Sequence, residues 1–215
     1  MPDKPLEGKK IAILVESEFI PEEIDAYRRV FTALGAEVHF MSYLWGQPKL
    51  TFTSAEQAGS KQLTLEVDID FQDINPDDYA AIIMAANYTS VRLRYFEPPP
   101  GQPFTADMVK SAPAVKFFAR AMANRCVVKG ALCHGLWILT PNPEMLKGRK
   151  VICHEVVLAD VLNCGAQYIR PDTENAGVMV DDDLVTGRSK HEVEAFIQAI
   201  VKQIQTISKE GDESA

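Results

Sequence analysis

Three apolar runs without polar alternation constrain the fold of this chain more than any other feature. They cover residues 10–15, 79–86 and 127–133, and each is rich in aliphatic side chains. A run of this kind is typical of a strand buried on both faces, as in a parallel sheet covered by helices. Segments with helical periodicity separate the runs, so we expect strand and helix to alternate.

The remaining segments fit the same alternation. Pro21 begins a helix that ends near Gly35, because proline suits a first turn and glycine suits the residue after a helix. Further strands are expected at 37–42, 63–69 (a hairpin or edge element), 146–153 (turn then strand), 167–169 and 178–187 (a hairpin), and further helices at 105–124, 156–163 and 190–207. The pattern predicts an α/β fold, a three-layer α/β/α sandwich with a mostly parallel sheet, as one domain over 1–215 with flexible tails at 1–8 and 208–215.

Charge and cysteine usage exclude several classes of function. The formal net charge of −8 has no basic blocks, so nucleic acid is not an expected partner. No apolar run is long enough to span a membrane and the first residues lack a signal-peptide core, which predicts a cytoplasmic protein. The four cysteines form no C-x-x-C pair, so we expect free thiols and neither a metal nor a cofactor.

Cys133 stands where the strand run 127–133 gives way to a helical pattern. A side chain at such a corner projects from the carboxyl end of its strand, beside the N–H groups of the new helix. The helix dipole would lower the pKa of a thiol there, so Cys133 is expected to be reactive. The other cysteines, Cys126, Cys153 and Cys164, are interpreted as inert core residues.

Neighbouring polar residues allow two interpretations each. His134 is either a helix-start histidine facing solvent or bonding a carboxylate, or a general base, and as the next residue its side chain is expected to diverge from Cys133. Glu23 either complements the dipole of its helix or is a partly buried carboxyl with a raised pKa that hydrogen-bonds the sulfur. His154 and Glu155 end a later strand and could reach the same rim of the sheet. Three carboxylates could orient a histidine: Asp25, Asp160 and Glu174.

The chain resembles the ThiJ/PfpI superfamily, a branch of the class I glutamine-amidotransferase-like fold with a flavodoxin-like sheet. The resemblance runs from about residue 9 to 204, and its strongest carriers are Ala-Leu-Cys-His-Gly at 131–135, the nucleophile elbow, and Pro-Glu-Glu-Ile at 21–24. It implies that Cys133 is the nucleophile, that Glu23 hydrogen-bonds it and that His134 belongs to a catalytic pair. His154 matches a histidine that another branch has near the cysteine.

Two departures from the superfamily pattern concern the pocket. Superfamily members usually carry Gly-Gly where this chain has Ala-Ala-Asn at 85–87, and a backbone N–H there helps to form the oxyanion hole. The N–H groups of Ala86 and His134 are the expected donors, although an alanine at a position of positive φ would cost energy. The proline-rich segment 92–105 is expected to reshape the mouth of the pocket.

Three functions remain open from the sequence. One is a cofactor-independent cysteine hydrolase or lyase that acts on small reactive carbonyl compounds, glyoxalase-like or deglycase-like. The others are an intracellular cysteine peptidase or amidase, and a redox-sensing or chaperone-like stress protein in which Cys133 is oxidised. The resemblance also implies a homodimer or a higher homo-oligomer, with a small-molecule substrate as the other partner.

Overall fold

The computed structural model describes residues 4–56 and 61–213 and has a six-stranded central sheet. Its strands are β1 (Lys10–Leu14), β2 (Glu37–Met41), β5 (Ala81–Met84), β6 (Val128–Leu132), β9 (Val178–Asp181) and β10 (Leu184–Gly187). They lie in the order β2-β1-β5-β6-β10-β9, and all neighbours are parallel except the hairpin of β9 and β10. The three apolar runs are therefore the central strands, as their lack of alternation predicts.

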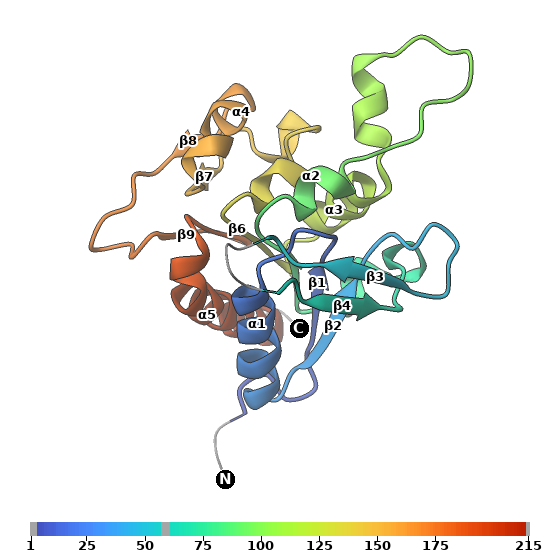
Figure 1. Ribbon diagram of the computed structural model, residues 1–215. Coiled ribbons are helices and arrows are strands. Elements are labelled where there is room, and N and C mark those ends of the chain that lie inside the picture. The colour runs from blue at the N-terminus through green and yellow to red at the C-terminus, as the bar shows by residue number, and fades with distance from the viewer. Residues whose placement is uncertain (1–3, 57–60, 214–215) are drawn as a thin grey trace.

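Helices cover both faces of this sheet and complete a three-layer sandwich (Figure 1). On one side α1 (Pro21–Ala33) packs against α5 (Val193–Glu213), which also contacts β6 and β10. The other side carries α2 (Thr89–Leu93), α3 (Pro113–Ala123) and several single 3-10 turns. Gly130 of β6 has no side chain because a Cβ there would meet Phe196 and Ile200 of α5 at 3.0 Å. The predicted α/β class and the mostly parallel sheet are confirmed.

Two small sheets and one short helix lie outside this core. An antiparallel pair consists of β3 (Leu50–Thr53) and β4 (Thr64–Val67), so the expected edge element at 63–69 is a separate hairpin. A parallel pair, β7 (Lys150–Val151) and β8 (Gln167–Tyr168), flanks α4 (Leu158–Asn163). Within the described residues, no helix is long and apolar enough to cross a membrane.

The structure corrects the expected tails. Leu6 is fully buried and its N–H donates to the carbonyl of Leu34, so the described part of 1–8 is attached to the core. The last helix, expected to end at residue 207, continues through Glu213. Neither the buried leucine nor the helix extension was expected, because a single leucine and a polar helix end produce no apolar periodicity in the sequence. Residues 1–3 and 214–215 lie outside the described residues.

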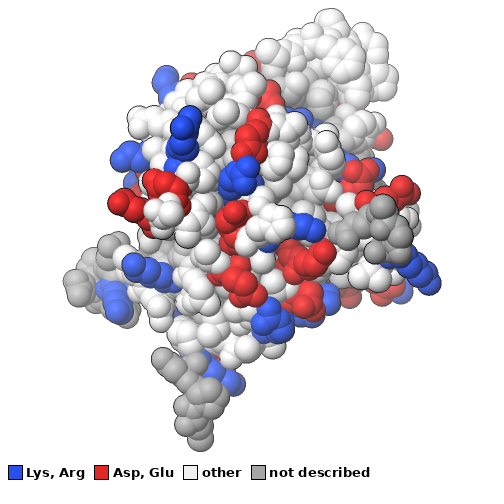
Figure 2. Space-filling view, turned by 60° about the vertical axis from the view of Figure 1, so that its left-hand side comes forward, with Lys and Arg blue, Asp and Glu red and all other residues white. Residues whose placement is uncertain are grey.

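Charged side chains on the surface are mixed in sign. Figure 2 shows acidic and basic groups interspersed over the face that it presents, with an uncharged area at its upper right. One ion-pair cluster is internal instead: the Lys129 ammonium and the Asp183 carboxylate are both buried and bonded to each other, and Arg149 reaches Asp183 at 2.7 Å. This cluster places a lysine inside the apolar run 127–133.

Candidate active site

Cys133 begins a sharp corner directly after β6. Its φ is +58°, in the left-handed region that costs a non-glycine residue energy and that clusters at functional sites. Main-chain hydrogen bonds hold the corner, because the Cys133 N–H donates to the Gly187 carbonyl at 2.8 Å and its carbonyl accepts from the His154 N–H at 3.3 Å. The nucleophile-elbow geometry expected from the sequence is therefore present.

The helix expected after the elbow is only a 3-10 turn at Gly135–Ile138. Gly135 fits there because a Cβ would lie 3.1 Å from the Met84 carbonyl oxygen. Four residues supply little aligned dipole, since the macrodipole arises from several turns of stacked peptide units. The expected lowering of the thiol pKa by a helix is therefore wrong.

The side chains of Cys133 and His134 meet. Sγ of Cys133 lies 2.9 Å from Nδ1 of His134, although neighbouring residues were expected to diverge. The left-handed φ of Cys133 turns the chain so that consecutive side chains converge. Both residues are almost fully buried, with 6% and 9% of their surfaces exposed.

Glu23 lies in the first turn of α1 but is completely buried. Tyr27, one turn later, donates its hydroxyl to Oε1 at 2.7 Å, and the Ala86 N–H lies 3.0 Å from both carboxyl oxygens. Glu23 is close enough to Cys133 to raise the pKa of the thiol electrostatically. Among the described contacts it does not hydrogen-bond the sulfur, so the dipole interpretation and the expected thiol contact are both corrected.

Burial sets the protonation of all three groups. It raises the pKa of Glu23 to about 8, and burial followed by the nearby Glu23 carboxylate raises the pKa of Cys133 to about 12. Burial, with His154 as the second cause, lowers the pKa of His134 to about 4. At neutral pH the site therefore holds an uncharged thiol, an uncharged carboxyl and a neutral imidazole.

One of the two expected backbone donors differs in the structure. The Ala86 N–H is engaged by Glu23, whereas the N–H groups of Asn87 and His134 are directed at the Cys133 sulfur and favour its thiolate. Asn87, not an alanine, takes the positive φ of +67°. Asparagine tolerates that conformation better than most residues, and its Nδ2 donates to the Glu18 carbonyl at 2.6 Å. The Ala86 N–H, predicted as an oxyanion donor, is therefore engaged by a carboxyl group, and the N–H of the next residue faces the sulfur instead.

Aromatic rings surround His134. His154 stacks on it with a centroid distance of 4.8 Å, while Trp137 and Tyr88 lie at 5.1 and 5.4 Å. Among the described residues no carboxylate hydrogen-bonds the imidazole. Asp160 accepts a hydrogen bond from the Trp137 indole at 2.7 Å instead. Asp25 and Glu174 are exposed, and neither carboxylate hydrogen-bonds the imidazole among the described contacts.

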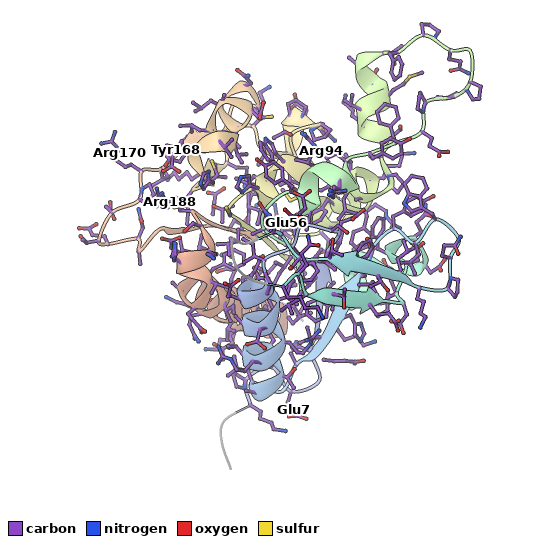
Figure 3. All side chains as sticks on the ribbon, viewed as in Figure 1. Glu7, Glu56, Arg94, Tyr168, Arg170 and Arg188 are labelled. Carbon is purple, nitrogen blue, oxygen red and sulfur yellow. The ribbon has the colours of Figure 1, made fainter. Side chains whose placement is uncertain are left out.

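His154 joins the site, and Glu155 lies at its edge, with Oε2 at 3.8 Å from His154 Nδ1. His154 Nδ1 accepts from the Val156 N–H at 3.2 Å, which fixes the ring beside His134. The Glu155 carboxylate is held by Arg188 at 2.6 Å, toward a surface cavity of about 720 Å³ that also includes Tyr168 and Arg170 (Figure 3).

The other predicted thiols separate into two groups. Cys153 and Cys164 are buried, as expected, whereas Cys126 is exposed. The prediction that Cys126 is a core residue is therefore wrong, because Cys126 directly precedes the apolar run and lies outside the strand. In the part of the chain that the structure describes, no group of three His, Cys, Asp or Glu side chains could hold a metal ion.

Sequence reasoning missed several side chains at this site. Tyr27 lies four residues after Glu23, and Trp137 four residues after Cys133. The helical spacing could have identified Tyr27, because residues four apart share a helix face. For Asn87, the only indication in the sequence that it belongs to the site was its position next to Ala86.

The fold and the elbow define a class of α/β proteins with a cysteine at the carboxyl end of a central strand. Residues 99–203 match the model of the DJ-1/PfpI family. The structure is similar to a ThiJ/PfpI family protein of Pseudomonas syringae, with a TM-score of 0.69 and 19% identity over 97% of this chain and 75% of that one. The segment that carries the elbow therefore matches the DJ-1/PfpI family, and the fold of the chain is similar to that of a ThiJ/PfpI family protein.

Other relatives extend the comparison over most of the sequence. An uncharacterized protein of Staphylococcus haemolyticus is 26% identical over 92% of this chain and 98% of its own. The Bacillus subtilis protein named "Putative cysteine protease YraA" is 24% identical over 88% of this chain and 94% of its own. A two-domain structure from Anabaena variabilis, with DJ-1/ThiJ/PfpI-like and ferritin-like domains, has a TM-score of 0.72 at 19% identity over 91% of this chain, which spans 48% of that longer one.

Proposed function

We propose that this protein is a cysteine-dependent enzyme that acts on small reactive carbonyl compounds. The observation that carries the proposal is the 2.9 Å contact between Cys133 Sγ and His134 Nδ1, beneath the N–H groups of Asn87 and His134. A thiol hydrogen-bonded to a neutral imidazole can transfer its proton as it attacks, so a free thiolate is not required at rest.

The first step forms a hemithioacetal. Sγ of Cys133 bonds to the carbonyl carbon, the π electron pair moves to the carbonyl oxygen, and the thiol proton passes to His134 Nδ1. The N–H groups of Asn87 and His134 stabilise the resulting oxyanion. The imidazolium then returns the proton to that oxygen, so the addition consumes no other reagent.

A 2-oxoaldehyde can react further without a cofactor. His134 removes the proton from the hemithioacetal carbon and returns it to the adjacent carbon, while the hydroxyl proton passes from the first carbon's oxygen to the second carbon's oxygen. The product is a 2-hydroxyacyl thioester. Water then cleaves the thioester into a 2-hydroxy acid and the free thiol. The net change is the addition of one water molecule, and Glu23, neutral at pH 7, adds no negative charge beside the enediolate.

Burial favours a small substrate over a polypeptide. Only 6% of Cys133 is exposed, and the rings of Tyr88, Trp137 and His154 surround the adjacent imidazole. An extended peptide needs an open groove in which its main chain can pass the nucleophile. Peptide cleavage also needs an acid for the leaving amine, and the imidazole has no carboxylate partner among the described residues.

Redox sensing is less favoured for an electrostatic reason. Oxidation by peroxide follows the thiolate population, and burial raises the pKa of Cys133 to about 12. A sensor would need the opposite shift. Assembly into a dimer or larger oligomer stays a prediction, measurable by sedimentation.

One set of assays separates the three functions. The purified chain and its Cys133→Ser variant are given methylglyoxal or a peptide library, and intact mass is recorded after mild peroxide, with Cys126→Ser as the exposed-thiol control. We expect lactate from methylglyoxal, lost in Cys133→Ser and kept in Cys126→Ser. Peptide cleavage that depends on Cys133, or a stable gain of two oxygens without turnover, would contradict the proposal.

A further inference from the structure

A large apolar pocket lies beside the candidate site but does not include Cys133 in its lining. Its volume is about 760 Å³, within the range of roughly 300–1,000 Å³ that is usual for small-molecule sites. The segment after α2, the loop at 140–143 and α4 form its walls. Most lining side chains are aromatic, aliphatic or proline: Val91, Tyr95, Phe96, Pro98, Phe104, Val109, Pro141 and Pro143.

This pocket gives the proline-rich segment a structural role. The segment leaves the body of the molecule after α2 and returns at α3, in the light-green excursion of Figure 1. Phe96 and Phe104, near its two ends, contact each other edge-on with a centroid distance of 6.5 Å. Prolines restrict the backbone between them, so the wall is partly preformed. Phe104 is nevertheless 74% exposed, which leaves one side of the pocket open to a ligand.

Arg94 brings a positive charge to this apolar lining. Its Nη1 donates to Thr140 Oγ1 at 3.0 Å and its guanidinium lies 5.9 Å from the Trp137 ring centroid. Its remaining N–H groups have no acceptor, and no carboxylate lies within ion-pair distance, among the described residues. Burial lowers the pKa of Arg94, which shows that its surroundings disfavour the charge.

Asp160 is the other charged side chain of the lining, and it does not neutralise Arg94. One of its oxygens accepts the Trp137 indole N–H at 2.7 Å, and it influences Arg94 only through longer-range attraction. A half-buried guanidinium without a close counter-ion is stabilised when an anion displaces water from its free N–H groups. The arginine fork suits a carboxylate in particular, because it can donate two parallel hydrogen bonds.

We propose that this pocket binds a small carboxylate with an apolar, preferably aromatic, body. The carboxylate accepts hydrogen bonds from the free N–H groups of Arg94, and the body packs between Phe96, Phe104 and the prolines. A second copy of the chain is the other conceivable occupant, but apolar contact alone would leave the guanidinium unpaired. The proposal does not depend on the reaction at Cys133.

Calorimetric titration with 4-phenylbutyrate and 4-phenylbutyramide tests the charge requirement without any substitution. We expect the carboxylate to bind the full chain at least about tenfold more tightly than the neutral amide, since a charge-assisted hydrogen bond is roughly twice as strong as a neutral one. Equal binding of the two probes, or no binding of either at millimolar concentration, would overturn the proposal.

Matched variants then locate the site. Arg94→Gln should weaken 4-phenylbutyrate binding about tenfold or more, whereas Arg92→Gln, two residues earlier and paired with Glu18, should leave it unchanged. Phe104→Ser should weaken both probes, and Cys133→Ser neither. Undiminished binding in Arg94→Gln would refute the assignment. So would a dimer that Phe104→Ser dissociates in sedimentation while neither probe binds.

Discussion

Cys133 Sγ and His134 Nδ1 lie 2.9 Å apart even though the two residues are adjacent in the chain. The positive φ of Cys133 makes this contact possible, and the end of β10 and the His154 N–H hold the corner in place. The proposed nucleophile and its proposed proton acceptor are thus carried by a single turn. Main-chain hydrogen bonds from two other segments hold that turn in place.

The alkylation rate of Cys133 should keep rising with pH. Burial and Glu23 raise the pKa of the thiol to about 12, so the thiolate population grows throughout the range from pH 6 to 10. Ionisation of Glu23, with its pKa of about 8, should reduce the slope above pH 8 because a new negative charge opposes the thiolate. Iodoacetamide kinetics read by peptide mass measure this. A rate plateau below pH 7 would show a lowered pKa and contradict the assignment.

Glu23 should make the folded state less stable as pH rises. Its folded pKa, about 8, lies above the value of 4.5 of an ordinary glutamate, so the native state holds the proton more tightly. The stabilisation is complete below about pH 4.5 and is lost progressively up to about pH 8. Urea unfolding at pH 5, 7 and 9 should show this loss in the unsubstituted chain and in Glu22→Gln, but much less in Glu23→Gln. If the free energy of unfolding depended on pH in the same way in all three proteins, the predicted contribution of Glu23 would be disproved.

The buried pair of Lys129 and Asp183 gives a stability prediction. Asp183→Asn removes the charge that faces a buried ammonium, and breaking such a pair costs about 3–5 kcal/mol. Asp182→Asn is the matched control, because Asp182 pairs with Arg125 at the surface, where ion pairs contribute about 0–1 kcal/mol. Chemical denaturation measures both. Equal losses of unfolding free energy in the two variants would show that the buried pair contributes no more to stability than the surface pair.

Asn87 should respond to backbone conformation more than to side-chain polarity. Asn87→Gly keeps the positive φ freely available, whereas Asn87→Val would strain a position at +67° by about 1–3 kcal/mol. Because the Asn87 N–H is directed at the Cys133 sulfur, the valine variant should also lose turnover of methylglyoxal. Unfolding and steady-state assays of both variants test this. A valine variant with unchanged stability and activity would contradict the predicted dependence of turnover on the backbone conformation at residue 87.

Much of the fold follows from local pattern. The runs 10–15, 79–86 and 127–133 are central strands, and a strand covered on both faces accommodates unbroken apolar sequence. The length of the helix after the elbow could not be predicted from this pattern, since an apolar segment of that length suits a 3-10 turn as well as an α-helix.

The site was predictable in its residues and not in its electrostatics. Cys133, His134 and Glu23 do come together, and His154 joins them. Their pKa values depend on burial, which arises from the packing of distant segments and leaves no signature in the local sequence. For the same reason the Ala86 N–H could not be recognised as a partner of Glu23.

The measurement that tests the central claim most directly is kcat/KM for methylglyoxal at pH 7.5 in His134→Gln, compared with the unsubstituted chain and His154→Gln. If His134 accepts the thiol proton, its loss should lower kcat/KM about 10²–10⁴-fold, the usual range for a positioned proton acceptor. His154→Gln should lower it far less, because His154 stacks on the imidazole without a contact to the sulfur. An unchanged kcat/KM in His134→Gln would contradict the account.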